Sequence, residues 1–267
     1  MWAIFLRLIK DKKVSIIVYC LATALFVWMY VGMFPTISEQ SEEFEAAFNS
    51  YPEEFFQAFN IEELSFDTIE KFLAIEQYSI VWPIMVLFFV ISFAGVALSG
   101  AIERGVIENV LAKPVSRMRI FFGRYLAGLI ALIIFTAVSI FSIIPLCELH
   151  NVEYNASAHS YMFIMALLFG WAVYSIAMMV SAMFSERSKT YMITGSTILL
   201  MYVANLVSSL IEELENLKYA SFFYYFDYNG AIIHEELYGV GVTIFIAVAI
   251  VCTCIGALWF NKRDIAV

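Results

Sequence analysis

The sequence predicts an all-α membrane protein with six transmembrane helices, in a single transmembrane domain over residues 1–267. Apolar residues make up 62% of the chain and charged residues 15%, with a mean hydropathy of +0.83, whereas soluble domains average about 45–50% and 25%. Six segments of roughly 19–24 residues contain no Asp, Glu, Lys, Arg or His. About 20 such residues are enough for a helix to cross a bilayer, so we expect a polytopic membrane protein.

The first 13 residues differ from the apolar segment that follows them. Trp2, Phe5 and Leu8 recur at helical spacing, opposite Arg7 and Lys10. This pattern predicts an N-terminal interfacial helix over residues 1–13, lying in the headgroup plane. The six expected spans cover residues 14–34, 80–101, 125–146, 161–184, 192–210 and 238–260, with an outer loop over residues 35–79 and a cytoplasmic loop over residues 102–124.

The outer loop is acidic and contains scattered phenylalanines. Eleven acids fall between residues 35 and 76. Pro52 followed by two glutamates is a helix-start signal, and Phe55, Phe56 and Phe59 would share one face of the helix. We expect a short amphipathic helix parallel to the outer membrane surface; the alternative is a solvated acidic loop.

Basic residues are sorted to one side of the expected membrane. With the N-terminus in the cytoplasm, 13 of the 15 Lys and Arg residues lie in cytoplasmic segments, and Lys71 and Lys218 lie outside. Loops rich in Lys and Arg stay in the cytoplasm. Both termini are therefore expected there, in a multi-pass protein of the cell membrane.

Several functional classes are disfavoured by the residue types that the chain lacks. Ion-coupled transporters carry ionisable groups at membrane depth, and the six spans have none. His150, His159 and His234 fall in outer loops, where lone histidines are usually solvated, so neither an enzyme nor a metal site is indicated. No phosphate-loop motif is present, so any ATP must be bound by a partner. No cofactor of the chain's own and no nucleic acid partner are expected.

Polar and small residues within the spans are expected to join helices. Polar side chains in apolar spans are typical of hydrogen bonds between transmembrane helices; here they include Tyr174, Ser175, Asn205, Ser208 and Thr243. The small residues between Ala94 and Gly100 are typical of a tight seam where two helices approach closely.

The most informative loop is Ile102–Arg124, with the sequence IERGVIENVLAKPVSRMRIFFGR. Apolar residues gather on one side of Glu103–Ala112, opposite Arg104 and Glu108, and Pro114 ends the pattern. A short cytoplasmic amphipathic helix is predicted over this segment. The alternative is an ordinary basic loop that only sets the topology.

The motifs of this loop resemble those of a known family. Glu103-Arg104-Gly105-Val106-Ile107-Glu108, then Lys113-Pro114-Val115-Ser116-Arg117 and Gly123-Arg124, are similar to the E-x-G-T-I-E, P-V-S-R and G-K motifs of type-2 ATP-binding-cassette (ABC-2) transporter permeases. The ending Phe260–Ile265 resembles the family's F-x-R-R-D-I, and the aromatic stretch Leu217–Tyr228 resembles the one before its last span. Val106, Ser221 and Arg124 depart from the residues common there, threonine, proline and lysine.

The resemblance implies the permease subunit of an ATP-driven exporter. It implies a second permease subunit, identical or related, and cytoplasmic ATPase subunits that bind ATP. The residues expected to couple the permease to the ATPase are Glu103, Arg104, Val106, Ile107, Glu108, Val110 and Leu111.

The cargo is expected to be hydrophobic or amphipathic, such as a peptide, lipid or drug, because the spans are uncharged and aromatic residues make up 17% of the chain. A membrane scaffold or sensor without transport activity is the alternative function.

The expected topology can be tested by cysteine labelling. Single cysteines at Ser65, Asn155 and Asn229 should react with an impermeant reagent in intact cells, and one at Ser188 should not, because basic loops are retained inside. Labelling of position 188 from outside would contradict the topology.

Overall fold

The computed structural model describes all residues except 42, 44, 46–55, 57–64, 108–114 and 265–267. Every regular element in the described ranges is a helix, so the all-α fold is confirmed. In chain order these elements are α1 (Trp2–Glu39), α4 (Ile69–Leu73), the π-helix η1 (Ala74–Val81), α5 (Trp82–Ala97), α6 (Ser99–Glu103), α8 (Arg117–Phe141), α9 (Ile143–His150), α10 (Ala156–Met183), α11 (Arg187–Leu210), the 3-10 helix η2 (Glu212–Ala220), α12 (Phe222–Tyr225), α13 (Tyr228–Ile232) and α14 (Gly239–Lys262).

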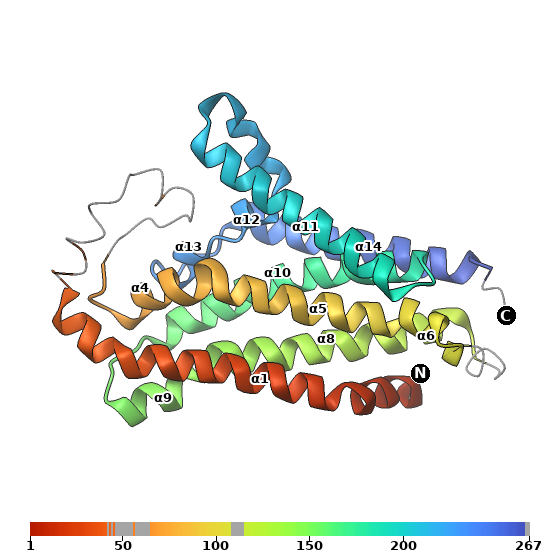
Figure 1. Ribbon diagram of the computed structural model, residues 1–267, viewed down its shortest axis with the longest axis horizontal. Helices are drawn as coiled ribbons and strands as arrows, with labels where there is room; N and C mark the ends of the chain where they lie inside the picture. Colours follow the sequence, from red (N-terminus) through yellow and green to blue (C-terminus); the bar gives the residue numbers. More distant parts are fainter. Residues whose placement is uncertain (42, 44, 46–55, 57–64, 108–114, 265–267) are drawn as a thin grey trace.

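Six helical stretches in the described ranges are long and apolar enough to cross a membrane, as predicted. They are Trp2–Glu39, Ile69–Ala97, Arg117–His150, Ala156–Met183, Arg187–Leu210 and Gly239–Lys262. Most of these helices run along the long axis of the molecule, and the start of α1 and the end of α14 lie at one end, together with α6 (Figure 1). We call this the basic end, because it carries the segments in which Lys and Arg gather.

The first helix differs from the prediction. α1 runs without a break from Trp2 to Glu39, so the expected boundary between an interfacial helix over residues 1–13 and a span over residues 14–34 is replaced by one helix. Its 38 residues make it about 57 Å long, well beyond the roughly 30 Å of a hydrocarbon core. Packing explains the difference, because Leu8 is buried and Ile4 lies against Gly123 of α8.

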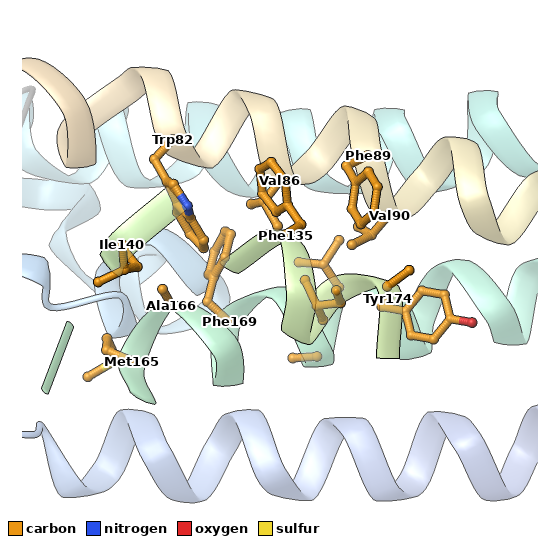
Figure 2. Packing of buried hydrophobic residues seen from close by; sticks show 14 of the residues in the cluster. Trp82, Val86, Phe89, Val90, Phe135, Ile140, Met165, Ala166, Phe169 and Tyr174 are labelled. Atoms are coloured by element: carbon orange, nitrogen blue, oxygen red, sulfur yellow. The ribbon is translucent and has the colours of Figure 1, made fainter. Parts of the chain in front are cut away.

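The core of the bundle forms around α10, which packs against α5, α8 and α14. Figure 2 shows Trp82 and Phe89 of α5 pointing toward the same cluster as Phe135 and Phe169. The rings of Phe89 and Phe135 stack with centroids 4.9 Å apart. The Trp82 indole nitrogen donates to the Ser139 hydroxyl over 2.9 Å, so this fully buried aromatic residue has its polar atom satisfied.

The second span is interrupted twice. Its Ala74–Val81 stretch is a π-helix, a conformation that often marks functional positions. At the other end, Leu98 has φ −120° and ψ −66°, which separates α5 from α6. The span expected over residues 80–101 therefore begins earlier, at Ile69, and is broken before it ends.

The small residues of this span form the tight seam that the sequence predicts. Ala94 and Ala97 are fully buried. A methyl group at Gly95 would overlap the ring of Tyr191 in α11, and the Ser181 hydroxyl of α10 donates to the Ala94 carbonyl over 2.7 Å. Larger side chains here would separate the helices.

The aromatic segment before the last span covers the core at the end opposite the basic end. Phe226, between α12 and α13, stacks on Trp82 with ring centroids 5.6 Å apart and lies 4.7 Å from the ring centroid of Phe169. The segment is therefore part of the core as well as a connection.

The amphipathic helix expected around Phe55, Phe56 and Phe59 lies outside the described residues, apart from Phe56. Continuous description resumes at Ser65. The Thr68 side chain then caps α4 by accepting from the Lys71 amide.

The structure refines the choice of labelling positions for topology. Asn155 and Ser188 are exposed, whereas Asn229 is only 2% exposed. Because this position is buried, a cysteine at 229 would not react with the reagent, whichever side of the membrane it faces. Glu236 lies in the same segment and is exposed, so a cysteine at Glu236 is the better outer position. The four native cysteines must be removed first, because Cys254 is exposed.

Gly128 of α8 tests the packing of the bundle. A methyl group there would overlap the buried Tyr174 hydroxyl of α10, so Gly128→Ala should cost about 1–3 kcal/mol through overpacking. Gly195→Ala is the matched control, because nothing lies within 4 Å of its added Cβ. Thermal unfolding of the purified chain should show a lower midpoint for Gly128→Ala alone; equal midpoints would contradict this packing.

Candidate coupling site and lateral groove

The segment expected to couple the protein to a partner begins at the basic end with a turn. α6 ends at Glu103, and Gly105 has φ 67°, a left-handed conformation that glycine adopts without strain. The Gly105 amide donates to the Ile102 carbonyl over 2.9 Å. The expected continuous helix over Glu103–Ala112 is therefore interrupted at its start, because the glycine ends the first helix.

The described residues of this segment are held by the rest of the chain. The Glu103 carboxylate accepts from the Arg187 amide at the start of α11, over 3.1 Å. Arg104 Nε donates to the Gly100 carbonyl over 2.8 Å. Ile107 is buried, whereas Val106 is 44% exposed. Glu108, Val110 and Leu111 lie outside the described residues.

The break at Leu98 determines how α6 leaves the bundle. The Ser99 amide donates to the Ser181 hydroxyl over 3.0 Å, and the Thr190 hydroxyl donates to the Ser99 hydroxyl over 2.9 Å. Arg124 of α8 is buried, and its guanidinium donates to the Ala97 carbonyl. Side chains from α8, α10 and α11 thus satisfy the polar groups at one interruption of the second span.

Two of the recognised motifs meet at the basic end. The Arg117 guanidinium of the P-V-S-R motif donates to the carbonyl of Arg263 in the C-terminal motif. Arg263 in turn donates to the Ala182 carbonyl over 3.0 Å and to the Ser185 hydroxyl. The C-terminal motif therefore fastens α14 to α8 and to the turn between α10 and α11.

Hydrogen bonds between the spans centre on the Tyr125 hydroxyl. It accepts from Trp171 Nε1 over 2.7 Å and from the Thr253 hydroxyl over 2.8 Å, and it lies 2.7 Å from the Ser175 hydroxyl. Because Trp171 and Ser175 belong to α10 and Thr253 to α14, three spans are joined. The prediction for Ser175 is thus confirmed.

The other polar residues expected to join helices divide into two groups. The Tyr174 hydroxyl of α10 donates to the Tyr125 carbonyl of α8 over 3.0 Å, as predicted. The Ser208 and Thr243 hydroxyls instead donate to carbonyls of their own helices, those of Asn205 and Gly239. Such bonds within one helix satisfy a hydroxyl without a partner helix.

Two of the three histidines depart from the expectation of solvated residues in outer loops. His150 is the last residue of α9, and its Nε2 accepts from the Trp28 indole nitrogen over 3.2 Å. His159 is fully buried in α10, and its Nδ1 lies 2.8 Å from the Asn155 carbonyl. The Asn155 amide donates to Glu70 over 2.7 Å, and its side chain donates to Glu235 over 2.6 Å. Hydrogen bonds from Ser157 and Asn155 lower the pKa of Glu235. This polar cluster ties the starts of α4 and α10 to the segment before α14.

A lateral groove between α5 and α11 was not apparent from the sequence. Its volume is about 320 Å³, and apolar side chains make up most of its wall. Its lining includes Ile84, Phe88, Gly195, Leu199 and Tyr202. The groove begins beside the π-helix, since Ser79 also lines it, and it offers a binding surface for apolar groups within the span region.

Comparison with known proteins identifies the family. The family model described as ABC-2 family transporter protein matches residues 5–265, nearly the whole chain. No match is found among curated proteins. The matched range contains all the motifs on which the resemblance rests and includes most or all of each of the six apolar helical stretches. The chain is therefore a multi-pass membrane protein that belongs to the ABC-2 transporter family, as the permease component of an ABC transporter.

Proposed function

We propose that this permease exports a hydrophobic or amphipathic cargo across the cell membrane, with both termini in the cytoplasm and energy from a separate ATPase subunit. The observation that carries the proposal is the connection between the coupling segment and the second span. α6 continues α5 beyond a single break at Leu98, so a force on the segment after α6 acts directly on a span that lines the lateral groove.

Contact with the ATPase is proposed through the coupling segment. Val106 offers an exposed apolar side chain at the basic end, and apolar anchors carry most of the energy of such interfaces. Ile107 is buried in this chain, so its role is to hold the segment against the bundle. Glu108, Val110 and Leu111 complete the proposed contact surface, with Glu103 and Arg104 fixing the turn.

The lateral groove supports the proposed cargo class. A pathway for an ion or a sugar polymer needs polar or charged groups at membrane depth, whereas this groove is lined mainly by aliphatic and aromatic side chains. Its position between α5 and α11 would let an amphipathic molecule enter from the lipid. The proposed cargo is therefore a peptide, lipid or drug with a substantial apolar surface.

A second permease subunit, identical or related, is part of the proposal. α11 makes its packing contacts mainly with α5, α10 and η2 and leaves Leu199, Leu200 and Val203 exposed. In Figure 1 this helix leans away from the rest of the bundle. A second copy or a related chain against α11 would enclose the groove between two subunits.

Val106→Asp tests the coupling surface without disturbing the core. The charge should weaken binding of the ATPase by about 30-fold or more, which corresponds to the loss of one apolar anchor. The measurement is co-purification of permease and ATPase, together with transport-linked ATP hydrolysis in liposomes.

Val240→Asp is the matched control, because Val240 is 52% exposed at the opposite end of the bundle. It should bind the ATPase normally. Unchanged binding by Val106→Asp, or an equal loss in both variants, would mean that this turn does not contact the ATPase. Aspartate at Ile107 would be ambiguous, since it would also disrupt the chain's own packing.

Gly195→Phe tests the lateral groove. Its Cβ would meet nothing within 4 Å, so the ring should fill the groove without unfolding the chain and should abolish stimulation of ATP hydrolysis by apolar cargo. Gly239→Phe is the control, because Gly239 also has open space around its Cβ and is not among the groove residues. Full cargo stimulation of Gly195→Phe would show that cargo does not use this groove.

A further inference from the structure

A cavity of about 810 Å³ lies at the basic end, between the start of α1, α6, and the starts of α8 and α11. Its lining combines aliphatic side chains with five cations: Arg7, Lys12, Arg104, Arg124 and Arg187. Asp11 is the single acid among the lining residues that the structure describes. The cavity therefore carries a strong positive potential, which neither the span count nor the resemblance predicted.

The chain's own acids balance this charge only in part. Asp11 pairs with Arg7 over 3.2 Å, and the nearby Glu103 accepts from the Arg187 backbone. Within the described part of the chain, the Lys12 ammonium forms no ion pair or hydrogen bond. Lys12 interacts repulsively with Arg187 and Arg104, and Arg124 interacts repulsively with Arg104 and attractively with Asp11. Like charges that line one cavity favour an anion between them.

The donors are suited to a phosphate group. Lys12 offers an ammonium, and arginine presents five N–H donors in a planar fork that matches phosphate oxygens. Arg124 uses its guanidinium on the Ala97 carbonyl, which leaves donors for a ligand. Because Arg124 is buried while Arg104 and Arg187 are exposed, the cations extend from the wall of the cavity to its mouth.

The position of the cavity along α1 favours a lipid as the source of that phosphate. Lys12 lies two residues before Val14, where the apolar part of α1 begins. Val14, Ile17 and Val18 are exposed on this helix. Trp2 is also exposed, and tryptophan is enriched at headgroup level. A lipid could place its headgroup in the cavity and its acyl chains along this face of α1.

We infer that the cavity binds the phosphate of an anionic phospholipid headgroup from the leaflet at the basic end. Basic pockets between transmembrane helices on the cytoplasmic side are typical sites for such headgroups. The bound lipid would tie α1 to α6, α8 and α11, next to the coupling segment. The inference concerns a resident lipid and does not depend on the direction or cargo of transport.

The experiment measures lipid binding by the full-length chain in an uncharged detergent, by native mass spectrometry and by thermal unfolding. Phosphatidylglycerol should bind saturably and raise the unfolding midpoint. Phosphatidylcholine, which has the same phosphodiester but no net charge, should have little effect. Inorganic phosphate tests whether a free anion takes the site.

Lys12→Gln together with Arg187→Gln should raise the half-saturating concentration of phosphatidylglycerol by about 30-fold, and Lys12→Gln alone by about fivefold. Lys10→Gln with Lys189→Gln is the matched control. Each of these lysines lies two positions from its counterpart and is exposed, and neither lines the cavity. The control should change binding by less than about threefold.

Several results would overturn the inference. Equal weakening by both double variants would mean that lipid binds only the general surface charge. Equal binding of phosphatidylcholine, or equal stabilisation by inorganic phosphate, would remove the anionic lipid as the ligand. Release of the ATPase by Lys12→Gln and Arg187→Gln with unchanged lipid binding would make the cavity part of the partner interface instead. The single variant keeps the test valid if the double variant fails to fold.

Discussion

The structure of the basic end depends on one constraint: the backbone polar groups at the Leu98 break must find hydrogen-bond partners. Where water is excluded, an unpaired backbone group costs several kcal/mol, so a break in a span persists only if other helices satisfy it. Ser181 pairs with the Ala94 carbonyl, and Arg124 with the Ala97 carbonyl. The break therefore joins the second span to two neighbours and fixes the direction in which α6 leaves the bundle.

Arg124 links the break to the basic cavity. A buried guanidinium is costly unless it is hydrogen-bonded. The Arg124 guanidinium donates to one backbone carbonyl, that of Ala97 at the break. Arg124 also lines the basic cavity, together with Lys12 and Arg187, so its remaining N–H donors and its charge are available to a ligand there. An anion bound in the cavity would thus interact with the same arginine that is hydrogen-bonded to the break. This arginine lies next to the proposed contact with the ATPase.

Composition and charge predicted the six spans, because a transmembrane helix can be recognised from its length and from the absence of charged residues within it. The irregularities could not be predicted in the same way. Residues 2–13 continue α1 because Ile4 and Leu8 pack against the bundle, a contact that local periodicity does not encode. Likewise, the break at Leu98 depends on Ser181 and Arg124, which are far away in the sequence. Within the candidate site, Gly105 was the one local signal of the turn that ends α6.

α5 connects the two parts of the molecule that the proposed mechanism requires. Its 16 residues form a regular helix, about 24 Å long, between the π-helix at one end and the Leu98 break at the other. Ile84 and Phe88 on this helix line the lateral groove, and α6 extends it toward the coupling segment. Coupling between distant sites requires an element with two arrangements. A regular helix between two interruptions can transmit a force along its length, so its own backbone needs to change only at its two ends.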